Sequence, residues 1–242
     1  MTLAIVSAMP DEISALMPLL QGAVVKRVAG RDFHCGRLAQ REVVLVLSGI
    51  GKVAAASTVT LLCHHFAASA IIFTGVAGGL GKHVKVGDVV LARTLLQHDM
   101  DASPIFPRWQ VPGTGRSHFD ADVAWTARLH SGAAKVLALG HPELAAFGIH
   151  APQLHHGLMV SGDRFVSSAA EAQRLQQELP EALAVDMESA AMAQVCADFA
   201  RPLAVLRTVS DRADAQAHVD FPSFLADVAA PYARDIVLAA LR

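Results

Sequence analysis

The segment ALAVDMESAAMAQVCADF, residues 182–199, combines a short apolar run with a helical pattern, and this pairing recurs along the chain. Its first five residues form a short, mostly continuous apolar run, which is typical of a strand buried on both faces. From Glu188 onward, small and apolar residues follow with helical spacing. Asp186 and Glu188 stand at the junction, so the segment predicts a buried strand and a helix with two carboxylates between them.

The same pairing of a short apolar run with a helical segment recurs along the chain. The runs that we expect to be strands are residues 3–8, 42–49, 69–75, 87–93, 155–162, 182–186 and 202–211. The helical patterns begin at residues 10, 52, 120, 169, 188 and 221. This alternation predicts an α/β fold with a largely parallel or mixed sheet covered on both faces. No long linker interrupts it, so we expect a single domain over residues 1–242.

Charge and hydropathy exclude several classes of partner. The chain has 20 Lys and Arg residues against 22 Asp and Glu residues, and like charges do not cluster. We therefore expect no nucleic acid and no anionic membrane as partner, but a small molecule or another protein. Residues 53–80 contain no charged side chain, yet His64, His65 and a Gly-rich end favour a buried helix and strand over a membrane span.

The cysteines and the N-terminal residues favour a cytoplasmic protein. Cys35, Cys63 and Cys196 are odd in number, widely spaced and set in apolar surroundings, which indicates reduced core thiols. The first residues, MTLAIVSAMPDE, lack a basic segment and become polar too early for a signal sequence.

Acidic residues follow several of the predicted strands. Glu12 comes after the first strand, Asp186 and Glu188 after residues 182–185, and Asp211 ends the last apolar run. Each one alone is well explained as a helix cap or an ion-pair partner. Ligands of open α/β sheets bind beyond the carboxyl ends of the strands, however. Together these acids indicate general acid and base chemistry there.

The sequence carries no pattern for other common chemistries. The segment TGVAGGLG, residues 74–81, lets a backbone approach a ligand, but it is neither G-x-G-x-x-G nor a phosphate-binding loop with Gly-Lys-Ser/Thr. The adjacent pairs His64–His65 and His155–His156 diverge on a helix or strand, and H-E-x-x-H is absent, so we expect no metal. Without G-x-S-x-G, no covalent nucleophile is indicated.

Several blocks together resemble one known family, the 5'-methylthioadenosine/S-adenosylhomocysteine nucleosidases of the nucleoside phosphorylase superfamily. The blocks are AMPDE (8–12), SGIGKVAAA (48–56), TGVAGGL (74–80), KVGDVV (85–90), VSGDRFV (160–166), VDMESAAMAQVC (185–196) and RTVSDRADAQAHVDFPSFL (207–225). They run in order over almost the whole chain and weaken between about 105 and 150. The resemblance implies a three-layer α/β/α sandwich around a twisted mixed sheet, and no cofactor.

The resemblance also implies a homodimer in which a loop of the neighbouring chain closes the alkylthio end of the site. The loop-forming stretch here is residues 98–120, rich in Pro and Gly yet apolar in part, which is typical of a segment that covers a ligand or packs on a partner. The residues that would reach the neighbour are Ala102, Ile105, Phe106 and Pro112.

The implied reaction is irreversible hydrolysis of an N-glycosidic bond, which releases adenine and a thio-substituted ribose. Asp211 matches the acid that protonates N7 of adenine, a role that requires a buried, protonated carboxyl group. Glu188 matches the residue that holds the ribose hydroxyls beside the developing cation. Glu12 matches the base that activates water, and Arg207 a residue that arranges the water and the carboxylates.

The remaining matches concern substrate binding. Phe165 corresponds to the aromatic residue that stacks on adenine, while backbone groups of Phe165 and Val166 read its edge. Met187 matches the family residue that packs on the sugar. The apolar lining matches Met9, Ile50 and Phe221, and further substrate contacts are expected at Val76, Gly78, Asp186 and Ser210.

Two departures leave the preferred substrate open. Val76 stands where many relatives have Ser, and Asp186 replaces a Glu, which shortens the reach to the sugar. A purine nucleoside phosphorylase of the same fold is a rival, but AMPDE replaces its Gly-Asp-Pro-x-Arg-like phosphate grip, and Glu12 would repel phosphate. A futalosine-type hydrolase and a non-catalytic nucleoside-binding protein remain as further alternatives.

Overall fold

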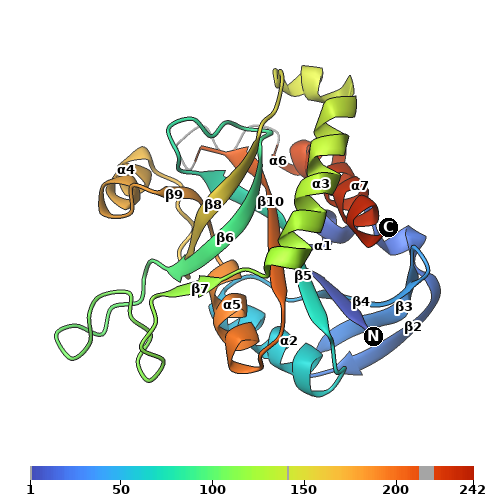
Figure 1. Ribbon diagram of the computed structural model, residues 1–242. Helices are drawn as coiled ribbons and strands as arrows, with labels where there is room; N and C mark the ends of the chain where they lie inside the picture. Colours follow the sequence, from blue (N-terminus) through green and yellow to red (C-terminus); the bar gives the residue numbers. More distant parts are fainter. Residues whose placement is uncertain (1, 141, 213–220) are drawn as a thin grey trace.

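The structure is a computed structural model that describes residues 2–140, 142–212 and 221–242 (Figure 1). Its strands are β1 (Leu3–Ser7), β2 (Gln21–Val28), β3 (Arg31–Leu38), β4 (Arg41–Leu47), β5 (Ala70–Gly79), β6 (Val89–Gln97), β7 (His118–Asp120), β8 (Leu154–Ser161), β9 (Ala182–Asp186) and β10 (Leu203–Asp211). Its α-helices are α1 (Pro10–Ile13), α2 (Lys52–His64), α3 (Val123–Leu139), α4 (Ala169–Glu178), α5 (Ser189–Asp198), α6 (Phe221–Phe224) and α7 (Ala230–Leu241). The short η1 (Met17–Leu19) and η2 (Pro142–Phe147) are 3₁₀-helices, and η3 (Leu225–Ala229) is a π-helical segment.

The strands form one mixed sheet, as predicted. Their order is β10-β6-β8-β9-β5-β1-β4-β3-β2, and β7 pairs with β6. An additional parallel pairing of β5 with β10 joins the two ends of the first part, so β5, β10, β6, β8 and β9 close into a ring. The remaining strands, beginning with β1, extend from β5 as an open sheet. The ring closure adds a barrel-like part to the expected sandwich.

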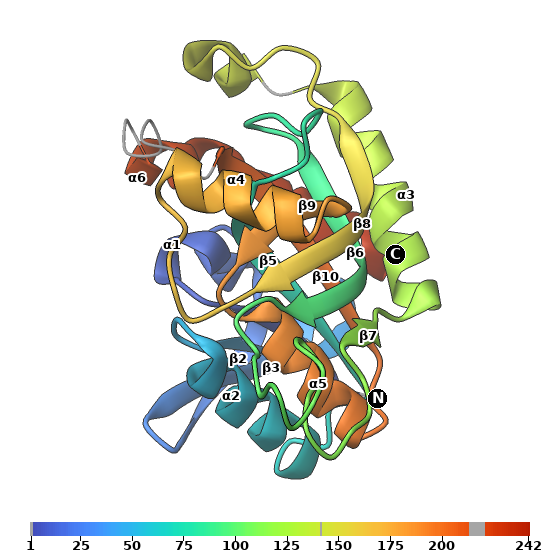
Figure 2. The same ribbon diagram turned by 90° about the vertical axis from the view of Figure 1, so that its left-hand side faces the viewer.

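Helices cover the sheet on two faces, which confirms the three-layer α/β/α prediction (Figures 1 and 2). Successive residues of β1 pack in two different cores. Ala4 lies in the core that includes α2 and α5, whereas Ile5 lies in the core that includes α3 and α7. This alternation is the two-residue period of a strand buried on both sides. A third, smaller core lies between α4 and the β8–β9 part of the ring, with Leu175 and Val185 among its members.

Three strands were not predicted from the sequence, namely β2, β3 and the short β7. β2 and β3 form an antiparallel hairpin at the edge of the sheet, and nearly all of β2 is exposed. Because such an edge strand buries little on either face, its residues lack the continuous apolar run that marked the inner strands. The predicted first helix is also shorter than expected, since α1 ends at Ile13 and only η1 follows.

The C-terminal ends of β1, β5, β8, β9 and β10 or the residues that follow them line a common region. On β10 the pairing with β5 is regular up to Val209, which lies opposite Ala77. The next residue of β5, Gly78, lies opposite Asp211 and not opposite Ser210. Ser210 is therefore an extra residue that forms a β-bulge at the end of the strand. No helix of the described residues is long and apolar enough to cross a membrane.

Candidate active site

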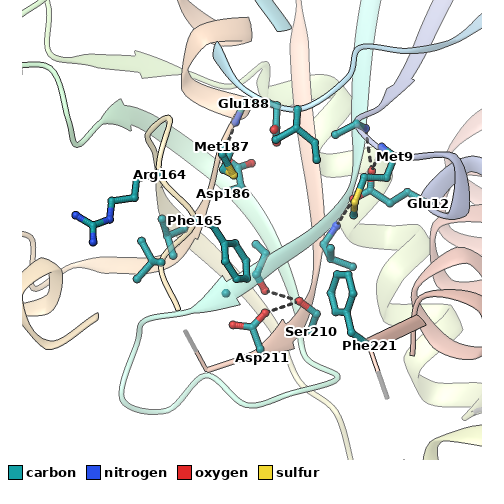
Figure 3. A pocket seen from close by; sticks show the side chains of 17 residues that line it. Met9, Glu12, Arg164, Phe165, Asp186, Met187, Glu188, Ser210, Asp211 and Phe221 are labelled. Atoms are coloured by element: carbon teal, nitrogen blue, oxygen red, sulfur yellow. Dashed lines mark hydrogen bonds between the residues drawn. The ribbon is translucent and has the colours of Figure 1, made fainter. Parts of the chain in front are cut away.

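A cavity of about 530 Å³ lies at these strand ends (Figure 3). That volume suits a small-molecule ligand. Its lining is Ala8, Met9, Glu12, Ile50, Val76, Ala77, Gly78, Arg164, Phe165, Val166, Val185, Asp186, Met187, Glu188, Ser210, Asp211 and Phe221. Every predicted substrate contact of the chain itself is among them, as are three of the four predicted catalytic residues. Arg207 lies directly behind the lining and contacts two of its carboxylates.

Glu12 is buried and held by three backbone amides. The helix α1 begins at Pro10, and the Glu12 side chain turns back so that Oε2 accepts hydrogen bonds from the N–H groups of Ala8 and Met9, both at 2.8 Å. Its Oε1 accepts from the Val76 N–H at 3.0 Å. Burial raises the pKa of Glu12, although Arg207 and these amides oppose the shift. A carboxylate with a raised pKa is a stronger base than a free one.

Arg207 is fixed in a fully buried position on β10. Its Nε and Nη2 both lie 2.9 Å from Oδ2 of Asp186, and its Cζ lies 3.7 Å from the centre of the Phe73 ring. Nη1 has no hydrogen-bond partner within the described part of the chain. An added methyl at Gly75 would lie 2.5 Å from Nη1 and 2.3 Å from Glu12 Oε1. Both atoms therefore face the space beside Gly75, where only glycine fits.

Asp186 is surrounded by protein donors. Its Oδ1 accepts hydrogen bonds from Ser161 Oγ at 2.5 Å, the Ser189 N–H at 3.1 Å and the Glu188 N–H at 3.2 Å. Its Oδ2 accepts from Ser189 Oγ and from Arg207. Asp186 lines the cavity as predicted, but these contacts give it a second task, which is to hold Arg207.

Glu188 lies at the N-terminal end of α5 and is also buried. Its Oε1 accepts a hydrogen bond from the Gly51 N–H at 2.8 Å, and its Oε2 lies 3.8 Å from Arg207 Nη2. Burial, and next the negative charge of Asp186, raise the pKa of Glu188 to about 7, against the opposing effects of Arg207 and Gly51. Its charge state therefore changes near neutral pH.

Asp211 lies across the cavity from Glu12 and Glu188 (Figure 3). Its side chain is only 5% exposed, and Ser210 Oγ donates a hydrogen bond to its Oδ2 at 2.7 Å. Because of the bulge, the adjacent residues Ser210 and Asp211 both line the cavity. In the view of Figure 3 the rings of Phe165 and Phe221 lie in the same part of the cavity as Asp211.

The predicted partner loop does not line the cavity of its own chain. Residues Ala102, Ile105, Phe106 and Pro112 are all outside the lining, and Ile105 is 81% exposed. The loop between β6 and β7 projects away from the body of the molecule (Figure 1). Residues that the sequence analysis missed, among them Ala8, Ala77, Arg164 and Val185, adjoin predicted ones and carry no signal of their own. In the described ranges no group of His, Cys, Asp and Glu side chains could hold a metal ion.

Comparison with known proteins identifies the class to which this site belongs. The sequence model of the family described as "Phosphorylase superfamily" matches residues 2–242, so the chain belongs to that superfamily.

Its relatives narrow the family. The chain is 36% identical to a 5'-methylthioadenosine/S-adenosylhomocysteine nucleosidase of Geobacillus kaustophilus over all of this chain and 97% of the relative. A nucleosidase of the same name from Neisseria meningitidis, solved with methylthio-immucillin-A, matches with a TM-score of 0.87 and 36% identity over 99% of this chain and 97% of that one. The S. pneumoniae enzyme, solved with the transition-state inhibitor MT-ImmA, gives 0.86 and 33% over 100% and 98%. Within the superfamily the chain is thus a member of the 5'-methylthioadenosine/S-adenosylhomocysteine nucleosidases.

Proposed function

We propose that this chain hydrolyses the N-glycosidic bond of 5'-methylthioadenosine and S-adenosylhomocysteine, with 5'-deoxyadenosine as a further candidate substrate. The products are adenine and the 5-thio-substituted ribose. The observation that carries the proposal is the meeting of Glu12, Glu188 and Asp211, which are far apart in the sequence, in one largely apolar cavity. The full-length likeness to nucleosidases supports the choice of substrate.

Asp211 is the proposed acid. Adenine leaves poorly as an anion, so protonation at N7 lowers the barrier to bond cleavage. The Ser210 hydroxyl orients the carboxyl group by its hydrogen bond to Oδ2. Phe165 stacks on the purine, and backbone groups of Phe165 and Val166 read its edge. We call the part of the cavity formed by Phe165, Asp211 and Phe221 the purine end.

Glu188 holds the ribose hydroxyls and stabilises the positive charge that develops on the sugar, while Met187 packs on the ring. Such a cation gains most from a carboxylate in a water-poor site, and Glu188 is buried. We call the part of the cavity formed by Glu12, Asp186 and Glu188 the ribose end.

Glu12 activates the attacking water. The water would lie near Gly75, where it could donate a proton to Glu12 Oε1 and accept a hydrogen bond from Arg207 Nη1. Val76 supplies no hydroxyl there, but its N–H fixes Oε1 of the base. Arg207 and Glu12 are thereby oriented before the substrate binds.

The alkylthio group lies against Met9 and Ile50, and the partner loop of a second chain closes this end in a homodimer. Ile50 and Val53 are 57% and 78% exposed, and such apolar surface beside the cavity suits contact with a second chain. Residues 1–242 act as one nucleosidase/phosphorylase-like domain without a cofactor. Its proposed substrates would place the enzyme in methionine salvage, and the three free cysteines suit a reducing cytoplasm.

The test is adenine release from 5'-methylthioadenosine in phosphate-free buffer. Asp211→Asn and Glu12→Gln should each lose activity by about 10²–10⁴-fold, because each removes one proton-transfer group. The exposed carboxylates Glu42 and Asp227 lie outside the cavity lining, so Glu42→Gln and Asp227→Asn are matched controls that should retain full activity.

Other outcomes would select a rival. Normal turnover by Asp211→Asn would show that the acid is assigned wrongly. Turnover that requires phosphate would indicate a nucleoside phosphorylase, and preference for a larger adenosine adduct would indicate a futalosine-type hydrolase. Tight nucleoside binding with no adenine released would indicate a non-catalytic binding protein.

A further inference from the structure

Three polar residues just outside the cavity lining form a closed ring of hydrogen bonds. Lys52 Nζ donates to Asp99 Oδ1 at 2.7 Å, and the Asp163 N–H donates to Asp99 Oδ2 at 2.9 Å. The ring closes where the Lys52 N–H donates to Asp163 Oδ1 at 2.7 Å. Asp99 and Asp163 each follow the end of a strand, β6 and β8, and Lys52 begins α2. The ring therefore fixes three separate segments to one another.

The side chains of the Lys52–Asp99 ion pair are partly shielded from solvent, whereas Asp163 is exposed. The Lys52 and Asp99 side chains are only 18% and 31% exposed. Burial alone would raise the pKa of Asp99, but the hydrogen bonds from Lys52 and from the Asp163 N–H outweigh it and leave the pKa below its usual value. A carboxylate that stays charged and is bonded through both oxygens holds its partners in a defined geometry.

Gly51 lies between this ring and the ribose end of the cavity. Its φ of +96° is one that residues with a side chain rarely adopt, and an added methyl would lie 3.1 Å from Asp163 Oδ1. The Lys52 N–H that bonds to Asp163 belongs to the peptide that follows Gly51. On the other side, the Gly51 N–H donates to Glu188 Oε1 at 2.8 Å. The direction of that N–H depends on how the ring fixes the loop.

We propose that Lys52, Asp99 and Asp163 are positioning residues for the Glu188 carboxylate and act on it through the Gly51 N–H. This proposal rests on the proposed role of Glu188 at the ribose. None of the three side chains lines the cavity, and the hydrogen bonds of Lys52 and Gly51 connect the ring to Glu188.

The central experiment compares Asp163→Ala with Asp163→Asn. The alanine variant loses the acceptor for the Lys52 N–H, whereas the asparagine oxygen can still accept it. We expect kcat/KM for adenine release to fall by about 10–100-fold in Asp163→Ala, since a small misplacement of a binding group has effects of this size. Asp163→Asn should stay within about threefold of the wild type. Equal losses in both variants would overturn the proposal.

A pH profile separates positioning from mere loss of structure. The Gly51 hydrogen bond is one of the groups that lower the pKa of Glu188. Its loss in Asp163→Ala should move the acidic limb of the kcat profile to higher pH. Lys52→Met should show the same direction of shift, with the exposed Lys135→Met as its control. If Asp163→Ala does not fold, Lys52→Met decides the question, and an unshifted limb contradicts the proposal.

A double-mutant cycle with Glu188→Gln distinguishes the two proposals. If the ring acts through Glu188, Asp163→Ala should have less than about a twofold effect in the Glu188→Gln background. An undiminished effect there would show that the ring acts by another route. If Glu188→Gln alone leaves adenine release unchanged, the proposed role of Glu188 fails instead.

Discussion

The ribose end of the cavity is held by hydrogen bonds from the protein, whereas the purine end presents aromatic surfaces. At the ribose end, amides bind Glu12 and Glu188, and Asp186 accepts from serine, amide and arginine donors. At the purine end, Phe165 follows β8 on a loop and is 51% exposed. The first arrangement fixes charged groups in advance, and the second contributes aromatic surface to the cavity.

The two ends differ in which groups the fold holds in place before a ligand binds. Charge develops on the sugar and on the attacking water during the proposed reaction, and fixed donors and carboxylates stabilise such charge most effectively. In the same proposal the purine receives a proton from Asp211 and stacks on an aromatic surface. Changes at the ribose end should therefore lower kcat, while changes to the aromatic surface should act mainly on KM.

The largest effect is expected from Gly75→Ala at the ribose end. The new methyl would overlap Glu12 Oε1 and Arg207 Nη1, and both must move from the place proposed for the water. We expect kcat to fall by at least about 10²-fold, measured by adenine release. In the control Gly148→Ala, nothing lies within 4 Å of the added methyl, so only stability should change. An active Gly75→Ala enzyme would place the attacking water elsewhere.

Asp186→Asn should have the next largest effect, because it removes the charge that pairs with Arg207. Breaking a buried ion pair costs roughly 3–5 kcal/mol, and we expect a loss of that order in the free energy of unfolding, together with a lower kcat. Denaturant unfolding and adenine release measure the two effects. Ser189→Ala leaves the Arg207 contact with Asp186 in place, so it should be milder in both assays. Equal losses would mean that the ion pair is not the main contribution.

At the purine end, Phe165→Leu should raise KM about tenfold and change kcat little. Stacking of a base on an aromatic ring contributes roughly 1–3 kcal/mol, which leucine recovers only in part. Steady-state kinetics with 5'-methylthioadenosine check this. A large fall in kcat at unchanged KM would contradict the division between the two ends.

The smallest effect is on stability, in Glu188→Gln. The folded-state pKa of Glu188 is about 7, above its ordinary 4.5. The charged form therefore destabilises the fold at high pH, and this penalty disappears as the pH falls from about 7 towards 4.5. Glutamine avoids the penalty, and we expect a Tm gain of a few degrees at pH 8 and none at pH 4.5. Thermal melts at both pH values test the sign. A gain of equal size at both would exclude titration as the cause.

The predicted lining residues other than the acids, such as Phe165 and Ile50, depended on the resemblance to the family. The sequence pattern itself predicted the inner strands, each an apolar run, and the placement of Glu12, Asp186, Glu188 and Asp211 after strands. It missed the β2–β3 hairpin, whose exposed residues carry no such run. It also missed the closed ring of strands, which depends on pairing between β5 and β10, far apart in the chain. The contacts of Asp186 and the ring of Lys52, Asp99 and Asp163 depend on distances that spacing does not encode.

The extra residue in β10 has one more consequence. Arg207 lies behind the ribose end of the cavity and Asp211 lines the purine end, and the bulge at Ser210 lies between them on β10. Loss of Ser210 would remove both the bulge and the hydroxyl group that donates a hydrogen bond to Asp211, so the position of the acid depends on this one extra residue. Anyone who transfers this chemistry to another scaffold must therefore copy the count of residues as well as their identities.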